Sequence, residues 1–147
     1  MHAQEQYTVD AAIAILNKYL RKSPAITSNP EAVRQYLRLN LEREDREVFY
    51  ALFLNAQLGV ISAHPMFYGS LRRAPVCREI ARKALLLNAA AVVVAHNHLS
   101  GDGTPSEADK RLTTQLKNTL DLVGIRLLDH FVVGAGNMTS FSEAGLL

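Results

Sequence analysis

Seven consecutive apolar residues, Ala89-Ala-Ala-Val-Val-Val-Ala95, lead directly into the polar sequence His96-Asn97-His98. An apolar run of this length without alternation is typical of a strand that is buried on both faces of a sheet. Helices must then cover both sides of that sheet, which predicts a three-layer α/β domain with the order helix–sheet–helix. The polar residues begin where the buried strand ends, and layered α/β folds commonly carry their sites there.

Further strands and helices are expected on both sides of this run along the chain. The aromatic and aliphatic segment 47–54, the turn 55–59 and a returning segment from Val60 predict a hairpin, which makes the sheet a mixed β-sheet. The other expected elements are helices from Thr8 and from Pro30, a helix at 78–87, a helix that ends at Gly124, and strands at 125–133 and from Met138. We interpret residues 1–45, with their two helices, as an N-terminal preface to the main domain at residues 46–147.

The helix after the polar segment has the clearest start signal. Thr104-Pro105-Ser106-Glu107 has the pattern of a capping box with proline at the first helical position. This assignment puts Asp109 in the second turn of the helix. The short loop 99–103, with its two glycines, can bring that turn back over the end of the strand.

His96, His98 and Asp109 form a candidate metal site. Residues two apart in an extended chain point to the same side, so both imidazoles can reach one point just beyond the strand. Two histidines and one carboxylate, with one position left for water, suit an open tetrahedral site for one zinc ion. Such a water would be acidified toward neutrality and become a nucleophile. A His-x-His pair on its own is also common among turn and surface histidines, and that alternative stays open here.

Composition limits the class of protein. The chain has 147 residues with 48% hydrophobic and 20% charged, which indicates one globular domain, and the apolar run at 89–95 is too short to span a membrane. Met1–Asp10 lacks the apolar core of a signal peptide, and the single cysteine, Cys77, excludes an internal disulfide, so we expect a cytoplasmic protein. The net charge is only +2, but basic residues gather between Arg72 and Lys83. This cluster is either a solvated surface or an attraction for DNA or an acidic peptide.

The complete pattern His96-x-His98-x7-Ser106-x2-Asp109 resembles the signature of the JAMM (MPN+/JAB) metalloproteases, and AHNHLSGDGTPSEAD at 95–109 is similar to the RadC branch of that family. The resemblance extends from about residue 47 to residue 147. It implies an MPN/JAB-like fold, which is also cytidine-deaminase-like. It further implies zinc ligands at His96, His98 and Asp109, an oxyanion-stabilising serine at Ser106, and a general acid/base at Glu47.

The function implied by this resemblance is a zinc-dependent hydrolase that cleaves a peptide or isopeptide bond in a peptide or protein substrate by metal-activated water. The competing class is a RadC-like, DNA-repair-associated binding module whose metal site is structural or weakly active. A zinc deaminase is excluded, because its H-x-E and P-C-x-x-C pattern is absent. Leu99 stands where RadC-like sequences usually have proline, and we expect the loop that it begins to be looser for that reason.

Overall fold

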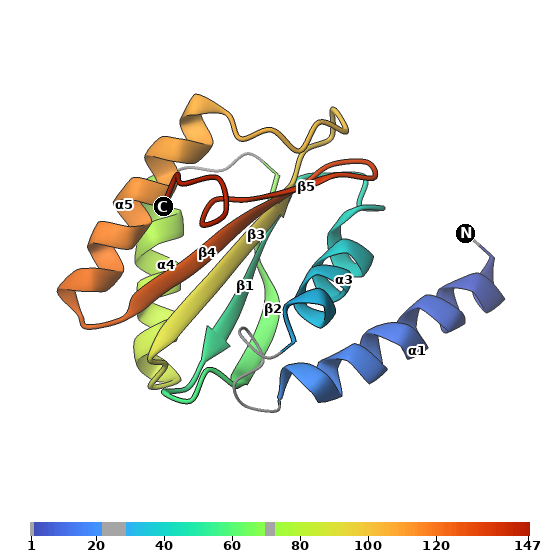
Figure 1. The fold of residues 1–147 in the computed structure, drawn as a ribbon, viewed down its shortest axis with the longest axis horizontal. Coiled ribbons are helices and arrows are strands. Elements are labelled where there is room, and N and C mark those ends of the chain that lie inside the picture. Colours follow the sequence, from blue (N-terminus) through green and yellow to red (C-terminus); the bar gives the residue numbers. More distant parts are fainter. Residues whose placement is uncertain (1, 22–28, 70–72) are drawn as a thin grey trace.

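A computed structural model describes residues 2–21, 29–69 and 73–147, and it has the expected α/β architecture with a mixed sheet between helices (Figure 1). The elements in chain order are α1 (Ala3–Leu20), α3 (Pro30–Leu41), β1 (Val48–Leu54), β2 (Val60–Tyr68), α4 (Arg73–Leu86), β3 (Ala91–Asn97), α5 (Glu107–Leu122), β4 (Arg126–Val133) and β5 (Met138–Ser140). Within these described ranges, no helix is long and apolar enough to cross a membrane.

The five strands lie in the order β2-β1-β3-β4-β5. Only β3 and β4 run parallel, connected through α5, and the other neighbouring pairs are antiparallel. As the apolar run predicted, β3 lies in the middle of the sheet and every one of its residues is buried. Its carboxyl end therefore lies beside the start of β1 and the end of β4.

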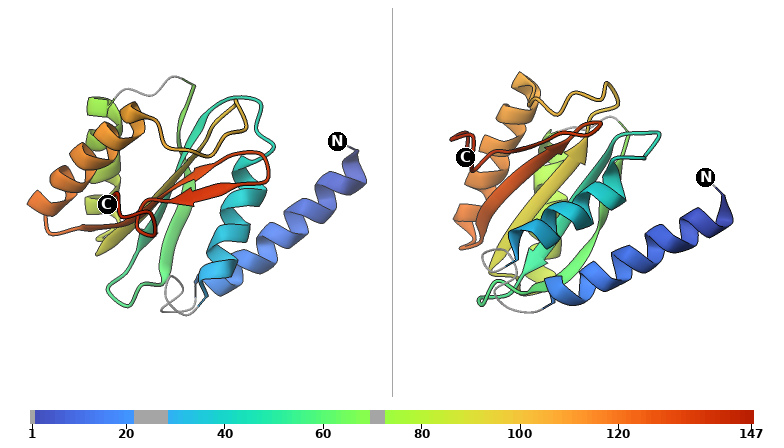
Figure 2. Two further views of the ribbon diagram at one scale, coloured as in Figure 1. Left: turned by 45° about the horizontal axis from the view of Figure 1, so that its top comes forward. Right: turned by 45° about the vertical axis from the view of Figure 1, so that its right-hand side comes forward.

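Each face of the sheet is covered by its own helices (Figures 1 and 2). On one face, α3 packs against alternate residues of β1 and β3, among them Tyr50, Leu52 and Val93, and α1 packs on α3. On the other face, α4 and α5 pack against the opposite set, including Phe49, Phe53 and Val92. Because α3 shares one apolar core with the sheet, it is a layer of the fold. The division between residues 1–45 and 46–147 stays a prediction.

Two helices begin earlier than the sequence predicted. Helix α1 starts at Ala3, so Thr8 does not cap it, and the Thr8 hydroxyl instead donates to the carbonyl of Gln4 one turn earlier. Helix α4 starts at Arg73 rather than at Arg78. Pro75 is the third residue of α4, and the helix tolerates it because backbone N–H groups of the first turn have no acceptor within the helix.

Helix α5 begins two residues later than predicted. Ser106, not Thr104, is the N-cap, and Glu107 is the first helical residue, so Pro105 lies outside the helix. Asp109 is consequently the third residue of the first turn rather than part of the second. Its backbone N–H donates to Ser106 Oγ at 3.0 Å, and its Oδ2 accepts the Ser106 N–H at 2.8 Å, which completes a capping box.

The loop between β3 and α5 packs against the turn before β5, and its greater freedom relative to a loop that begins with proline stays a prediction. Asn137, in the turn before β5, accepts from the Gly103 N–H at 2.6 Å and donates to the Gly101 carbonyl at 2.9 Å. Gly103 and Gly134 touch so closely that a Cβ on either would clash with Asn137 Oδ1 or nearby backbone. The glycines of this loop therefore allow close packing against the β4–β5 turn.

Candidate metal centre

The structure brings the three expected ligands together where β3 ends and α5 begins. His96 pairs with Phe49 of β1 in the sheet register and lies on the face covered by α4 and α5. His98 follows two residues later on the same side, and the first turn of α5 places Asp109 against both rings. His96 is 1% exposed and Asp109 is 8% exposed, so the cluster lies at the base of the loop with little contact to solvent.

The ligand atoms of these residues converge on one point. His96 Nε2 lies 3.1 Å from His98 Nε2 and 3.1 Å from Asp109 Oδ1, and His98 Nε2 lies 2.9 Å from Asp109 Oδ2. Tetrahedral ligands at zinc–nitrogen bond lengths are about 3.3 Å apart, which is close to this spacing. The three residues could therefore hold a metal ion.

The outer nitrogens of both imidazoles have hydrogen-bond partners that turn Nε2 inward. His98 Nδ1 lies 2.9 Å from the carbonyl oxygen of Asp102, which only accepts, so Nδ1 carries a proton and Nε2 is the nitrogen that faces Asp109. His96 Nδ1 lies 2.8 Å from Nε2 of His130 in β4. An imidazole nitrogen this close to a carboxylate oxygen is stable only with a positive charge between them, which is either a proton on the ring or a bound metal ion.

Asp109 is held in its ionised form. Burial by itself would raise the pKa of the Asp109 carboxyl. The hydrogen bond and charge of His96, the N–H of Ser106 and the charge of His98 outweigh burial and hold that pKa well below its usual range. The same carboxylate thus accepts the Ser106 N–H at the start of α5 and faces both histidines. The capping box therefore also fixes the position of this candidate ligand.

Glu47 and Ser106 line the same hollow as the three ligands, and the hollow has a volume of about 390 Å³. Glu47 precedes β1 and is half-buried, and it does not belong to the ligand cluster. The Ser106 Oγ accepts the Asp109 N–H, which leaves the hydroxyl proton of Ser106 available to a bound molecule. The structure therefore places all five sequence-predicted residues around one cavity.

Sequence reasoning missed Asn97, which lies between the two histidines and is 3% exposed. Its Oδ1 accepts the Val48 N–H at 2.7 Å and its Nδ2 donates to the Arg46 carbonyl at 3.0 Å. The side-chain amide thereby holds the backbone on both sides of Glu47, and the Glu47 carbonyl accepts the Gly69 N–H at 2.8 Å. The alternation of a strand was the available signal, since Asn97 must point away from His96 and His98 toward the opposite face.

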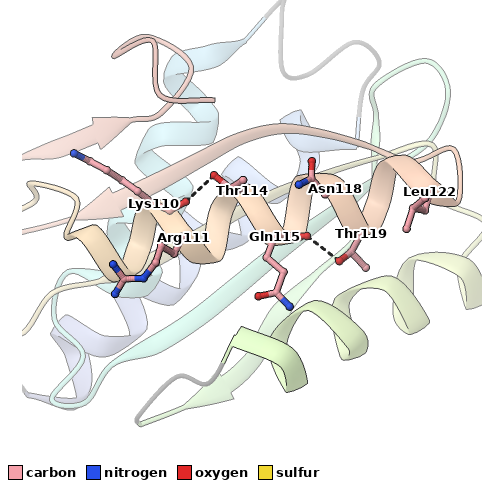
Figure 3. Close-up of a pocket in the computed structure, with 7 residues that line it drawn as sticks. All are labelled: Lys110, Arg111, Thr114, Gln115, Asn118, Thr119 and Leu122. Carbon is pink, nitrogen blue, oxygen red and sulfur yellow. Dashed lines mark hydrogen bonds between the residues drawn. The ribbon is translucent and has the colours of Figure 1, made fainter.

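A second hollow, of about 490 Å³, lies on the outer surface of α5 (Figure 3). All of its lining side chains come from that one helix, and it contains none of the metal-ligand candidates. The hydroxyls of Thr114 and Thr119 donate to carbonyls of α5 itself. We therefore treat this hollow as a surface feature of the helix and assign the site to the cluster at the end of β3.

Comparison with known proteins agrees with this geometry. The model of the RadC-like JAB domain family matches residues 27–146, a range that includes α3 as well as the sheet. A UPF0758 protein of Stenotrophomonas maltophilia is 47% identical over 145 residues, which cover 95% of this chain and 62% of that protein. A UPF0758 protein of Leptothrix cholodnii is 48% identical over 97% of this chain and 64% of its own length.

The UPF0758 protein YfjY of Escherichia coli is 43% identical over 97% of this chain and 89% of its own length. The chain thus spans less than two thirds of the first two relatives and most of the third. The family model covers most of the chain, and the His96, His98 and Asp109 cluster lies within the matched range. This chain belongs to the family of proteins with a RadC-like JAB domain.

Proposed function

We propose that this chain is a zinc-dependent hydrolase of the JAMM type that cleaves a peptide or isopeptide bond in a peptide or protein substrate. The observation that supports this most directly is the convergence of two imidazole nitrogens and the Asp109 carboxylate in a hollow that Glu47 and Ser106 also line. Two nitrogens and one carboxylate oxygen suit zinc and leave its fourth position open.

The residues around the hollow have complementary chemistry for amide hydrolysis. Zinc held there would supply a Lewis acid that lowers the pKa of a bound water and polarises a carbonyl. Glu47 would accept the proton of the attacking water and return it to the leaving amine. The Ser106 hydroxyl, fixed by the Asp109 N–H, would donate to the substrate oxygen as negative charge develops on it.

The test begins with metal analysis of the purified chain at neutral pH and continues with a peptide-library cleavage assay read by mass spectrometry. We expect one zinc per chain and cleavage that is lost with a chelator and restored by zinc. Glu47→Gln should keep the zinc and lower the cleavage rate about 10²- to 10⁴-fold. Glu44→Gln, at an exposed carboxylate three residues earlier, is the matched control and should keep the rate.

Other outcomes would favour different interpretations. Full activity in Glu47→Gln would move the proton-transfer role to another carboxylate. Absence of cleavage together with salt-sensitive DNA binding that ignores the chelator would favour the DNA-associated module. In the structure, Arg78 and Arg82 of the basic cluster both lie within 4.0 Å of Glu79, while Arg72 lies outside the described residues. The DNA-binding alternative stays a prediction.

A further inference from the structure

A second buried histidine lies directly behind the ligand His96. His130, in β4, is 1% exposed, and its Nε2 lies 2.8 Å from His96 Nδ1. Its other nitrogen, Nδ1, lies 2.6 Å from the hydroxyl of Thr113, and that hydroxyl donates to the carbonyl of Asp109 at 2.7 Å. The chain of contacts therefore starts at one ligand, His96, and ends on the backbone of another, Asp109.

The direction of every hydrogen bond in this chain follows from its last member. The Asp109 carbonyl can only accept, so the single hydroxyl proton of Thr113 points toward it. The Thr113 oxygen must then accept a proton from His130 Nδ1. A neutral imidazole has one donor and one acceptor, so His130 Nε2 accepts from His96 Nδ1. The proton on His96 Nδ1 makes Nε2 the nitrogen that a metal ion would bind, since a metal-bound imidazole nitrogen carries no proton.

The surroundings of His130 keep it neutral and in place. The ring of His130 is almost completely buried, and burial disfavours the charged form of an imidazole. The ring of His130 stacks on Phe141 at a centroid distance of 4.7 Å, and Phe49 contacts its edge at 5.7 Å. The ring has little room to turn, which leaves the choice of tautomer to its two hydrogen-bond partners.

We propose that His130 and Thr113 are positioning residues that hold His96 in the tautomer with a free Nε2 lone pair and tie it to the turn of α5 that carries Asp109. This inference rests on the metal binding in the proposed function but not on the hydrolysis. Partners behind a ligating histidine typically change metal affinity about 10- to 100-fold when they are removed. Here the partner is a neutral histidine, and its own tautomer is set by one threonine hydroxyl.

Two substitutions at Thr113 separate this role from simple packing. Thr113→Val keeps the volume of the side chain but removes the hydroxyl, so His130 can change tautomer and present an N–H to His96. Thr113→Ser keeps the hydroxyl but removes a buried methyl group. We expect Thr113→Val to lose about 10- to 100-fold in zinc affinity and Thr113→Ser to stay within a few-fold of the parent chain. Affinity is measured by competition with a chromophoric chelator, and melting temperatures of the metal-free proteins are measured in parallel.

A packing role predicts the opposite order, because Thr113→Ser would then be the more damaging change. Equal zinc affinity in Thr113→Val and the parent chain would overturn the inference. If the parent chain itself binds no zinc, the proposed function fails instead, and the two failures are thereby distinguished. Long-range nitrogen–proton NMR of the zinc-loaded parent chain gives a direct check. His96 and His130 should both carry their proton on Nδ1, and a proton on Nε2 of His130 would contradict the assignment.

Discussion

The Asn97 side chain should contribute measurably to stability because its amide makes two hydrogen bonds to backbone groups at the start of β1, the Val48 N–H and the Arg46 carbonyl. Asn97→Ala removes the acceptor for the buried Val48 N–H, which costs about 1–3 kcal/mol. Loss of the bond to the Arg46 carbonyl adds about 0.5–1 kcal/mol, since Arg46 is exposed and water can replace the amide there. The expected loss in the free energy of unfolding is about 1.5–4 kcal/mol.

Urea unfolding of the metal-free chain measures this loss. With a urea dependence of about 2 kcal/mol per M, the midpoint should fall by about 0.75–2 M. Asn118→Ala, on the exposed surface of α5 (Figure 3), is the matched control and should change stability by less than about 0.5 kcal/mol. A loss below about 0.5 kcal/mol in Asn97→Ala would refute the argument that this amide holds the backbone around Glu47.

Three further predictions follow from the same region. Leu99 is the second residue of a turn that is closed by the hydrogen bond from the Gly101 N–H to the His98 carbonyl. Within the described part of the chain the Leu99 N–H donates to no acceptor, so proline would remove no hydrogen bond. Leu99→Pro should therefore raise the free energy of unfolding by about 0.4–1 kcal/mol, measured by urea titration. Lower stability or weaker zinc binding would show that leucine is preferred there. Gly103→Ala should cost about 1–3 kcal/mol by the same measurement, because its Cβ would clash with Asn137 Oδ1; an unchanged midpoint would mean that the loop can yield. Burial in the folded chain holds the pKa of His130 below 6.5, so on acidification the unfolded chain takes up this proton first. The contribution of neutral His130 to the free energy of unfolding is therefore complete above about pH 6.5. Below that pH it falls by up to about 1.4 kcal/mol per pH unit. The metal-free His130→Phe variant should lack this part of the slope, and an identical slope would argue against a neutral buried His130.

The sequence predicted the layered fold correctly because a strand that is buried on both faces must be apolar at every position, and that pattern can be recognised locally. Seven apolar residues without alternation required a central strand with helices on either side, and β3 has that place. The boundaries of the helices were less well predicted. Helix starts depend on small differences between competing caps, so α5 begins after Ser106 although Thr104-Pro105 offers an equally good local signal.

Spacing made His96, His98 and Asp109 candidate ligands, because residues two apart in a strand share a side and the following helix is only a short loop away, but spacing alone left turn or surface histidines as an alternative. The side chains that orient them could not. His130 is distant in sequence from His96, and the parallel pairing of β3 with β4 brings His130 Nε2 to 2.8 Å from His96 Nδ1. Thr113 reaches His130 because α5 packs its buried side on that part of the sheet.

What the amino-acid order indicated by itself is the layered α/β class, the end of the sheet that carries the site, and three candidate metal ligands, whereas Glu47 and Ser106 were named through the family resemblance. What only the tertiary structure decided is how those residues are held: the Asn97 amide beside Glu47, the loop packed on Asn137, and the contact between His96 and His130. The physical reason is that the donor set follows from local periodicity, whereas the direction of each hydrogen bond depends on partners that meet only when distant strands and helices pack together.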